Sequence, residues 1–201
     1  MNKEFHEFIN SFEYDEDTIF DTAQFVMNEL YPKAIPLEML FRIIYLANRT
    51  SALCYGGVIV HDVPVVDSSM GGNPGFHMHK LKHYLDRSRD DIRSRWYKYF
   101  DTRYGKIRLR FEDPNPYFGE LSINNCKLLK SQIERYLYRG GQYRDSVAQS
   151  LGALPEFPVM HGNAPQLREV FIAMGLDEEH ISSLLMGAGL DFTISKTGGT
   201  I

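Results

Sequence analysis

The sequence predicts an α+β fold that is mostly helical and carries a small antiparallel sheet. Over most of the chain, apolar residues recur every three or four positions, which is typical of amphipathic helices. Two shorter stretches, 56–66 and 106–113, are instead β-branched or alternate between apolar and charged residues, as strands do. The 201 residues fit one globular domain over 1–201, with a possible sub-boundary near 153–165 and a loose tail over 196–201.

The first forty-nine residues are expected to be helical. Their apolar positions form stripes on helices over 5–12, 19–30 and 36–48. Pro36 falls near the first position of the third helix, where its missing N–H costs nothing. The stretch 56–66, GGVIVHDVPVV, is β-branched and glycine-led, so we interpret it as one strand or a short hairpin.

A long or broken helix is expected in the middle of the chain. The glycine-rich stretch 67–75 is interpreted as a loop, and Asn73-Pro74 is a favourable pair for the N-cap and first position of a helix. Apolar residues then follow at steps of three and four as far as Trp96. We therefore expect this helix to end near Gly105.

Strict alternation predicts a strand over 106–113. Lys106, Arg108 and Arg110 project from one face of it, while the apolar residues between them face the core. The stretch GELSI, 119–123, is expected to be the return strand after a turn. Further helices are expected over 124–141, 143–152, 166–175 and 177–189, and a last strand over 190–195.

The charges of the chain are strongly segregated. Residues 1–40 contain nine acids and two bases, whereas residues 80–110 contain eleven bases and four acids, although the whole chain has a net charge of only −4. A basic segment with interleaved aromatic residues is typical of a polyanion-binding surface, because phosphates attract cations and exposed bases stack on flat rings.

The first hypothesis for function is therefore a non-catalytic binding or regulatory protein that contacts nucleic acid or an acidic protein surface through segment 80–110. An alternative explanation is that the acidic N-terminal helices cover this segment within the same fold. The residues expected to make the contact are Lys80, Lys82, Arg87, Arg89, Arg93, Arg95, Lys98, Arg108 and Arg110, with Tyr97 as a stacking surface.

A second hypothesis is a metal-dependent hydrolase. His79, His83 and Asp86 have the i, i+4, i+7 spacing that places two imidazoles and a carboxylate on one helix face, a ligand set that suits catalytic zinc. His61 or Asp62 are candidates for further ligands. Against this hypothesis, the face is expected to be solvated and flanked by cations that oppose a dication. No other cofactor is indicated.

A third hypothesis is a protein–protein inhibitor or immunity-type module that uses the acidic N-terminal helices. The first seventeen residues are acidic and lack the basic and apolar regions of a signal peptide, so we expect a cytoplasmic protein. The apolar stretches are too short and too charged for membrane insertion. Cys54 and Cys126 are expected to be reduced, buried thiols, and the oligomeric state is not indicated.

Overall fold

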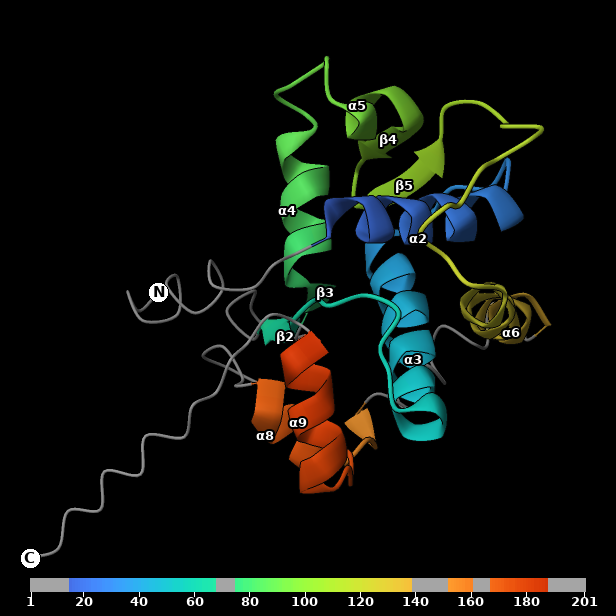
Figure 1. Cartoon of the computed structure of the whole chain (residues 1–201). Coiled ribbons are helices and arrows are strands. Elements are labelled where there is room, and N and C mark those ends of the chain that lie inside the picture. Colours follow the sequence, from blue (N-terminus) through green and yellow to red (C-terminus); the bar gives the residue numbers. More distant parts are fainter. Residues whose placement is uncertain (1–14, 68–74, 139–151, 161–166, 188–201) are drawn as a thin grey trace, which may run out of the picture.

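The computed structural model describes residues 15–67, 75–138, 152–160 and 167–187, and it has the expected mostly helical α+β architecture (Figure 1). The helices are α2 (Glu16–Glu29), α3 (Leu37–Tyr55), α4 (His79–Arg87), α5 (Arg95–Tyr99), α6 (Ile123–Tyr138), α8 (Leu167–Ala173) and α9 (Glu178–Gly187). The strands are β1 (Ile35–Pro36), β2 (Pro64–Asp67), β3 (Gly75–Met78), β4 (Phe100–Arg103) and β5 (Lys106–Leu109).

The helix α3 is the central element of the core. It packs against α6, α2 and β3, and Figure 1 shows α2 lying across its N-terminal end. Asp15 begins α2 by accepting hydrogen bonds from the backbone N–H groups of Asp17 and Thr18. One cluster of buried apolar side chains extends from α2 to α9, so the helices share a common core.

The predicted strand over 106–113 is confirmed only for its first four residues, which form β5, and residues 110–113 form no strand. Its side chains alternate as expected, with Ile107 and Leu109 buried and Lys106 and Arg108 exposed. The predicted return strand over 119–123 is wrong, because this stretch forms no strand. Instead, β5 lies in the middle of a three-stranded antiparallel sheet with the order β1-β5-β4.

The helix that was expected to be long or broken is broken, and its expected end is a strand. The helix α4 ends at Arg87, the short helix α5 begins at Arg95, and the chain leaves the helical conformation after Tyr99 to form β4. The apolar spacing that suggested one long or broken helix therefore reflects two short helices and a strand that bury their side chains in the same core.

The helix α4 begins later than the sequence suggested. Gly75–Met78 forms β3, which pairs with β2 in a two-stranded hairpin, and α4 starts at His79. Asp62 lies outside α4 but accepts hydrogen bonds from the backbone N–H groups of Lys80 at 2.8 Å and Leu81 at 3.0 Å. A carboxylate from another segment thus satisfies the free donors at the start of this helix. Asn73 and Pro74 lie outside the described residues.

The helix α3 is longer than expected and ends at Gly56, whose φ of 67° forms a left-handed C-cap. Cys54 therefore lies on α3 and is exposed, and the expectation of a buried thiol there is wrong. Cys126 on α6 is partly buried. Both thiols are free.

The predicted helices in the C-terminal part are confirmed as α6, α8 and α9. The predicted helix over 5–12, the predicted helix over 143–152 except Gly152, the predicted strand over 190–195 and the tail over 196–201 lie outside the described residues. Within the described parts of the chain, none of the helices combines the length and the apolar character needed to span a bilayer.

Candidate nucleic-acid interface

The β4–β5 hairpin is closed by a two-residue turn, Tyr104-Gly105. Both residues have positive φ, 53° and 69°, which identifies the I′ geometry that fits the twist of a hairpin. A residue other than glycine in this conformation costs roughly 1 kcal/mol. The Gly105 carbonyl accepts a hydrogen bond from the Leu37 N–H at 2.8 Å, so the hairpin tip is fixed to the start of α3.

Strand alternation divides the hairpin into two faces. Phe100, Ile107 and Leu109 point into the core and are buried. The opposite face carries the cross-strand pairs Asp101↔Arg108 and Arg103↔Lys106, and Arg110 follows directly after β5. We call Asp101, Arg103, Lys106, Arg108 and Arg110 the hairpin face. It contains four cations and one carboxylate.

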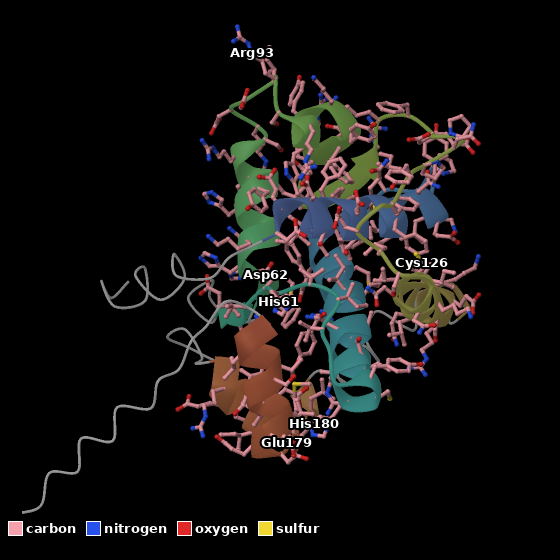
Figure 2. The ribbon with its side chains drawn as sticks, viewed as in Figure 1. His61, Asp62, Arg93, Cys126, Glu179 and His180 are labelled. Atoms are coloured by element: carbon pink, nitrogen blue, oxygen red, sulfur yellow. The ribbon has the colours of Figure 1, made fainter. Side chains whose placement is uncertain are left out.

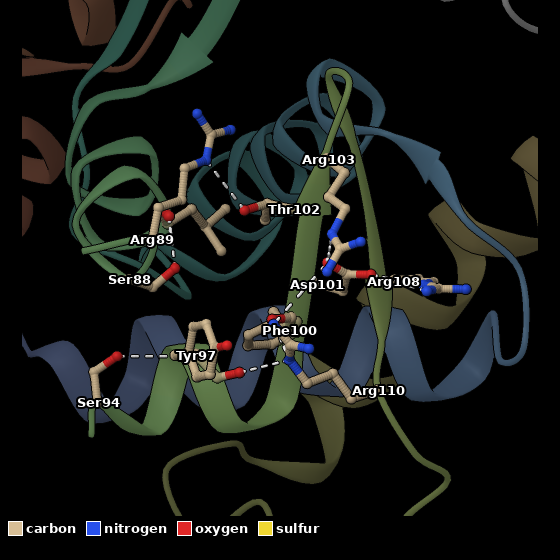
Figure 3. Close-up of polar contacts among 11 residues, drawn as sticks. Ser88, Arg89, Ser94, Tyr97, Phe100, Asp101, Thr102, Arg103, Arg108 and Arg110 are labelled. Carbon is tan, nitrogen blue, oxygen red and sulfur yellow. Dashed lines mark hydrogen bonds and ion pairs between the residues drawn. The ribbon is translucent and has the colours of Figure 1, made fainter. Parts of the chain in front are cut away.

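Three of these cations surround the one carboxylate, as Figure 3 shows. Arg108 donates from Nε and Nη2 to Asp101 Oδ2 at 3.1 and 2.9 Å, and Arg103 Nε lies 3.0 Å from Oδ1. Arg110 Nη2 lies 4.0 Å from the same Oδ1. Burial raises the pKa of Asp101, but the Arg108 hydrogen bonds and the charges of Arg103 and Arg110 outweigh it and hold this pKa below 3.8.

Arg110 is held in place by further contacts. Its Nε donates to the backbone carbonyls of Tyr97 at 2.7 Å and Phe100 at 3.0 Å, and its guanidinium lies 4.5 Å from the centre of the Tyr97 ring. Its side chain remains 30% exposed, compared with 57% for Arg108 and 71% for Arg103. The three guanidiniums are therefore positioned by the fold while still accessible to a ligand.

A fourth arginine joins this region from another element. Arg89, just after α4, places Nε 3.4 Å from the hydroxyl of Thr102 on β4 (Figure 3). Its Nη1 lies 3.7 Å from Oδ1 of Asp86, so its charge is partly compensated. The basic region thus continues from the hairpin toward the end of α4.

Arg95, which the sequence placed in the binding surface, turns toward the acidic helix α2. It forms ion pairs with Asp17 and, at 3.6 Å, with Glu16, and its guanidinium lies 4.4 Å from the centre of the Phe20 ring. The acidic N-terminal segment therefore does compensate one cation of the basic run. Because this charge is already paired, we leave Arg95 out of the proposed interface.

The remaining cations of the basic run occupy several separate places. Lys80, Lys82 and Arg87 lie on α4, and Lys98 lies on α5. Figure 2 shows Arg93 at the outer end of the connection between these two helices, directed away from the molecule. These residues therefore belong to two separate helices and to the connection between them.

The candidate metal residues line an open groove on α4. Asp86 Oδ2 lies 2.8 Å from Lys82 Nζ, so that carboxylate already has a cationic partner. Among the residues that the structure describes, no group of three or more His, Cys, Asp and Glu side chains is arranged to hold a metal ion. The groove has a volume of about 470 Å³ and is lined by His77, His79, Lys82, His83, Asp86, Arg87 and Asp90.

His61 and Asp62 do not extend this histidine group. Asp62 is buried, and its carboxylate accepts the backbone hydrogen bonds that begin α4. His61 borders a small cavity of about 20 Å³ between α3 and α8, and burial lowers its pKa. A space of that size holds about one water molecule. It is too small for a substrate.

A second buried carboxylate lies beside α3. Glu156 is fully buried, and its Oε1 accepts hydrogen bonds from the Tyr45 hydroxyl at 2.8 Å and from Arg49 Nε at 2.5 Å. Its Oε2 has no hydrogen-bond partner among the described residues. This arrangement ties the segment 152–160 to α3, so we assign it a structural role.

Three residues of the hairpin face, Asp101, Arg103 and Lys106, are absent from the contact residues expected from the sequence. Arg103 and Tyr104 were assigned to the end of the long helix, although Tyr-Gly followed by strict alternation is a signal for a hairpin turn. Reading that dipeptide as a two-residue loop would have paired Arg103 with Lys106 and placed Asp101 opposite Arg108.

No family model, curated protein or solved structure gives a significant match to this chain.

Proposed function

We propose that this protein is a non-catalytic binding protein that contacts nucleic acid through the hairpin face. The observation that carries the proposal is the group of three arginines around the single carboxylate of Asp101. Four cations against one carboxylate leave a net positive charge on this face, which attracts phosphates and favours the release of their counterions.

The arginines of the hairpin face keep donors for a ligand. A guanidinium has five N–H donors, and Arg108 directs only its Nε and Nη2 atoms at Asp101. The contacts to Asp101 also restrict the rotamers of these long side chains before a ligand arrives. Binding then costs less side-chain entropy than it does for a freely moving arginine.

The spacing of the cations suits a phosphate chain. Lys106, Arg108 and Arg110 occur at every second position, which places successive cations about 7 Å apart along an extended strand. Guanidiniums bind phosphates with two parallel hydrogen bonds, as they also bind carboxylates. Exposed aromatic side chains near the basic segment, among them Tyr104 and Phe111, favour nucleic acid over an acidic protein.

The proposal is tested by the salt dependence of oligonucleotide binding, measured by fluorescence anisotropy. We expect Arg103→Ala/Arg108→Ala to weaken binding about tenfold or more. This variant should also reduce the slope of log K against log [salt] by about 1.4 for a single strand. The matched control is Lys127→Ala/Arg135→Ala, which removes two exposed cations from α6. This control is expected to bind like the wild type.

Two results contradict the proposal. One is equal loss of affinity in the α6 control, which indicates a general effect of net charge. The other is binding to an acidic polypeptide with no binding to oligonucleotides, which assigns the hairpin face to a protein partner. Thermal melting by circular dichroism establishes that each variant is folded.

A further inference from the structure

The most exposed aromatic side chain of the described residues lies at the tip of the hairpin. Tyr104 is 100% exposed, whereas the other tyrosines of the basic segment, Tyr84, Tyr97 and Tyr99, are partly buried. No aromatic contact of Tyr104 occurs within the described part of the chain. The ring therefore contributes nothing to the packing that the structure shows.

The turn itself does not explain a tyrosine at this position. Tyr104 adopts a φ of 53° in a I′ turn, where asparagine, aspartate or glycine fits with less strain. A bulky residue with a strained backbone and a fully exposed side chain lowers the stability of the free protein and makes no packing contact with the described residues in return. Such a residue at the edge of a cationic surface points to a ligand.

The neighbours of Tyr104 define the chemistry of that ligand. Arg103 precedes it and Lys106 follows Gly105, and these two cations form the last cross-strand pair before the turn. An aromatic ring between two cations presents a flat face for a base and positive charges for the phosphates on either side of it. In a duplex, the bases stack on each other and their faces are not accessible.

We propose that the hairpin binds single-stranded nucleic acid, with one unpaired base stacked on Tyr104 and the adjacent phosphates held by Arg103 and Lys106. This inference rests on the proposed function and adds the class of nucleic acid. A β-ribbon also fits the major groove of duplex DNA. Preference for a duplex is therefore the outcome that opposes this proposal.

The test compares a labelled single-stranded oligonucleotide with the duplex of the same sequence, using wild type, Tyr104→Phe and Tyr104→Asn. Tyr104→Asn removes the ring and suits the left-handed conformation of the turn, so it keeps the hairpin intact. We expect it to lower single-strand affinity about 5- to 150-fold, the range for one stacked base, with little change for the duplex. Tyr104→Phe keeps the ring and is expected to bind like the wild type.

The outcomes separate this inference from the proposed function. Equal single-strand affinity of Tyr104→Asn and wild type overturns the stacking, even if Arg103→Ala/Arg108→Ala loses binding. Tighter binding of the wild type to the duplex overturns the preference for single strands. A wild type that binds neither oligonucleotide overturns the proposed function as well. An unchanged or higher melting temperature of Tyr104→Asn shows that any loss of affinity is not a loss of folding.

Discussion

The indole of Trp96 donates a hydrogen bond from Nε1 to Oε1 of Glu16 at 2.9 Å, and this bond joins residues that are 80 positions apart. Through it, α5 docks on α2. The Trp96 ring packs against Phe20, with ring centres 5.0 Å apart at an angle of 81°, and against Phe100. The start of the hairpin that carries the proposed interface is thereby attached to the N-terminal half of the core.

We expect Glu16→Ala to lower the free energy of unfolding by about 1 kcal/mol, because the buried indole N–H loses its acceptor. Glu16→Gln keeps an acceptor and is expected to be close to the wild type. Urea unfolding, monitored by the fluorescence of Trp96, measures the free energy of unfolding of both variants. The control is Glu134→Ala on the exposed surface of α6. If Glu16→Gln is as unstable as Glu16→Ala, the charge opposite Arg95 is the important feature and not the hydrogen bond.

We expect Asp101→Asn to destabilise the protein by about 1–3 kcal/mol near neutral pH, because it removes the charge that holds Arg103, Arg108 and Arg110 together. The lowered pKa of Asp101 means that its contribution is present above about pH 3.8 and is lost as the pH falls through the folded-state value. The stability difference between wild type and Asp101→Asn should therefore shrink as the pH falls from about 4 to about 2. A difference that is constant over this range contradicts the ion-pair role of Asp101.

Two carboxylates at the starts of two helices are expected to have opposite pH dependence. Burial raises the pKa of Asp62 to about 6, although the N–H groups of Lys80, Leu81 and Val63 lower it. Exposed Asp15 at the start of α2 has a lowered pKa, chiefly because of its hydrogen bond with the Thr18 hydroxyl. A raised carboxyl pKa lowers stability as the pH rises from the unfolded to the folded value.

Relative to Asp62→Asn, wild type should therefore lose about 2 kcal/mol of stability between pH 4 and pH 6, out of about 3 kcal/mol for the whole pKa shift at 1.36 kcal/mol per pKa unit. Relative to Asp15→Asn, wild type should instead lose stability as the pH falls below 4. Urea unfolding at half-unit pH intervals compares the two variants. If the Asp62 difference changes in the same direction as that of Asp15, the backbone donors outweigh burial.

The Tyr45–Glu156 hydrogen bond is expected to couple two parts of the core. Tyr45→Phe should cost about 1 kcal/mol in wild type, because Glu156 loses one of its donors. In the Glu156→Ala background the same substitution should cost less, with a coupling energy of about 0.5–3 kcal/mol. A double-mutant cycle from urea unfolding measures this coupling. Additive effects show that the hydroxyl finds equivalent partners without Glu156.

The two cysteines are expected to differ in reactivity. Cys54 is exposed on α3, whereas Cys126 is partly buried and burial raises its pKa. A thiol reagent at pH 8 should therefore modify the chain in a fast and a slow phase. Cys54→Ser should remove the fast phase, and Cys126→Ser should remove the slow phase. The opposite assignment contradicts the burial of Cys126.

Much of the helical framework follows from local patterns. The helices α2, α3 and α6 each have an apolar face that is stable only when it is buried. The periodicity of their apolar residues therefore identifies them as helices. The alternation of β5 is equally clear, because Ile107 and Leu109 are separated by Arg108. The boundaries of the helices and the pairing of the strands were predicted less well than the helices themselves. The start of α4 depends on Asp62, a residue that is distant in the sequence, and the strand partner of β5 depends on the turn at Gly105.

By itself, the sequence determined the class of fold and the presence of a basic segment. Both are properties of residue order and composition. Hydrophobic periodicity shows that one face of an element is buried, but it does not show which other element covers that face. Only the tertiary structure decided which cations remain available. Arg95 is paired with acids of α2, whereas Arg103, Arg108 and Arg110 share one carboxylate on an open strand face. Charge compensation depends on distance in space, and packing sets that distance.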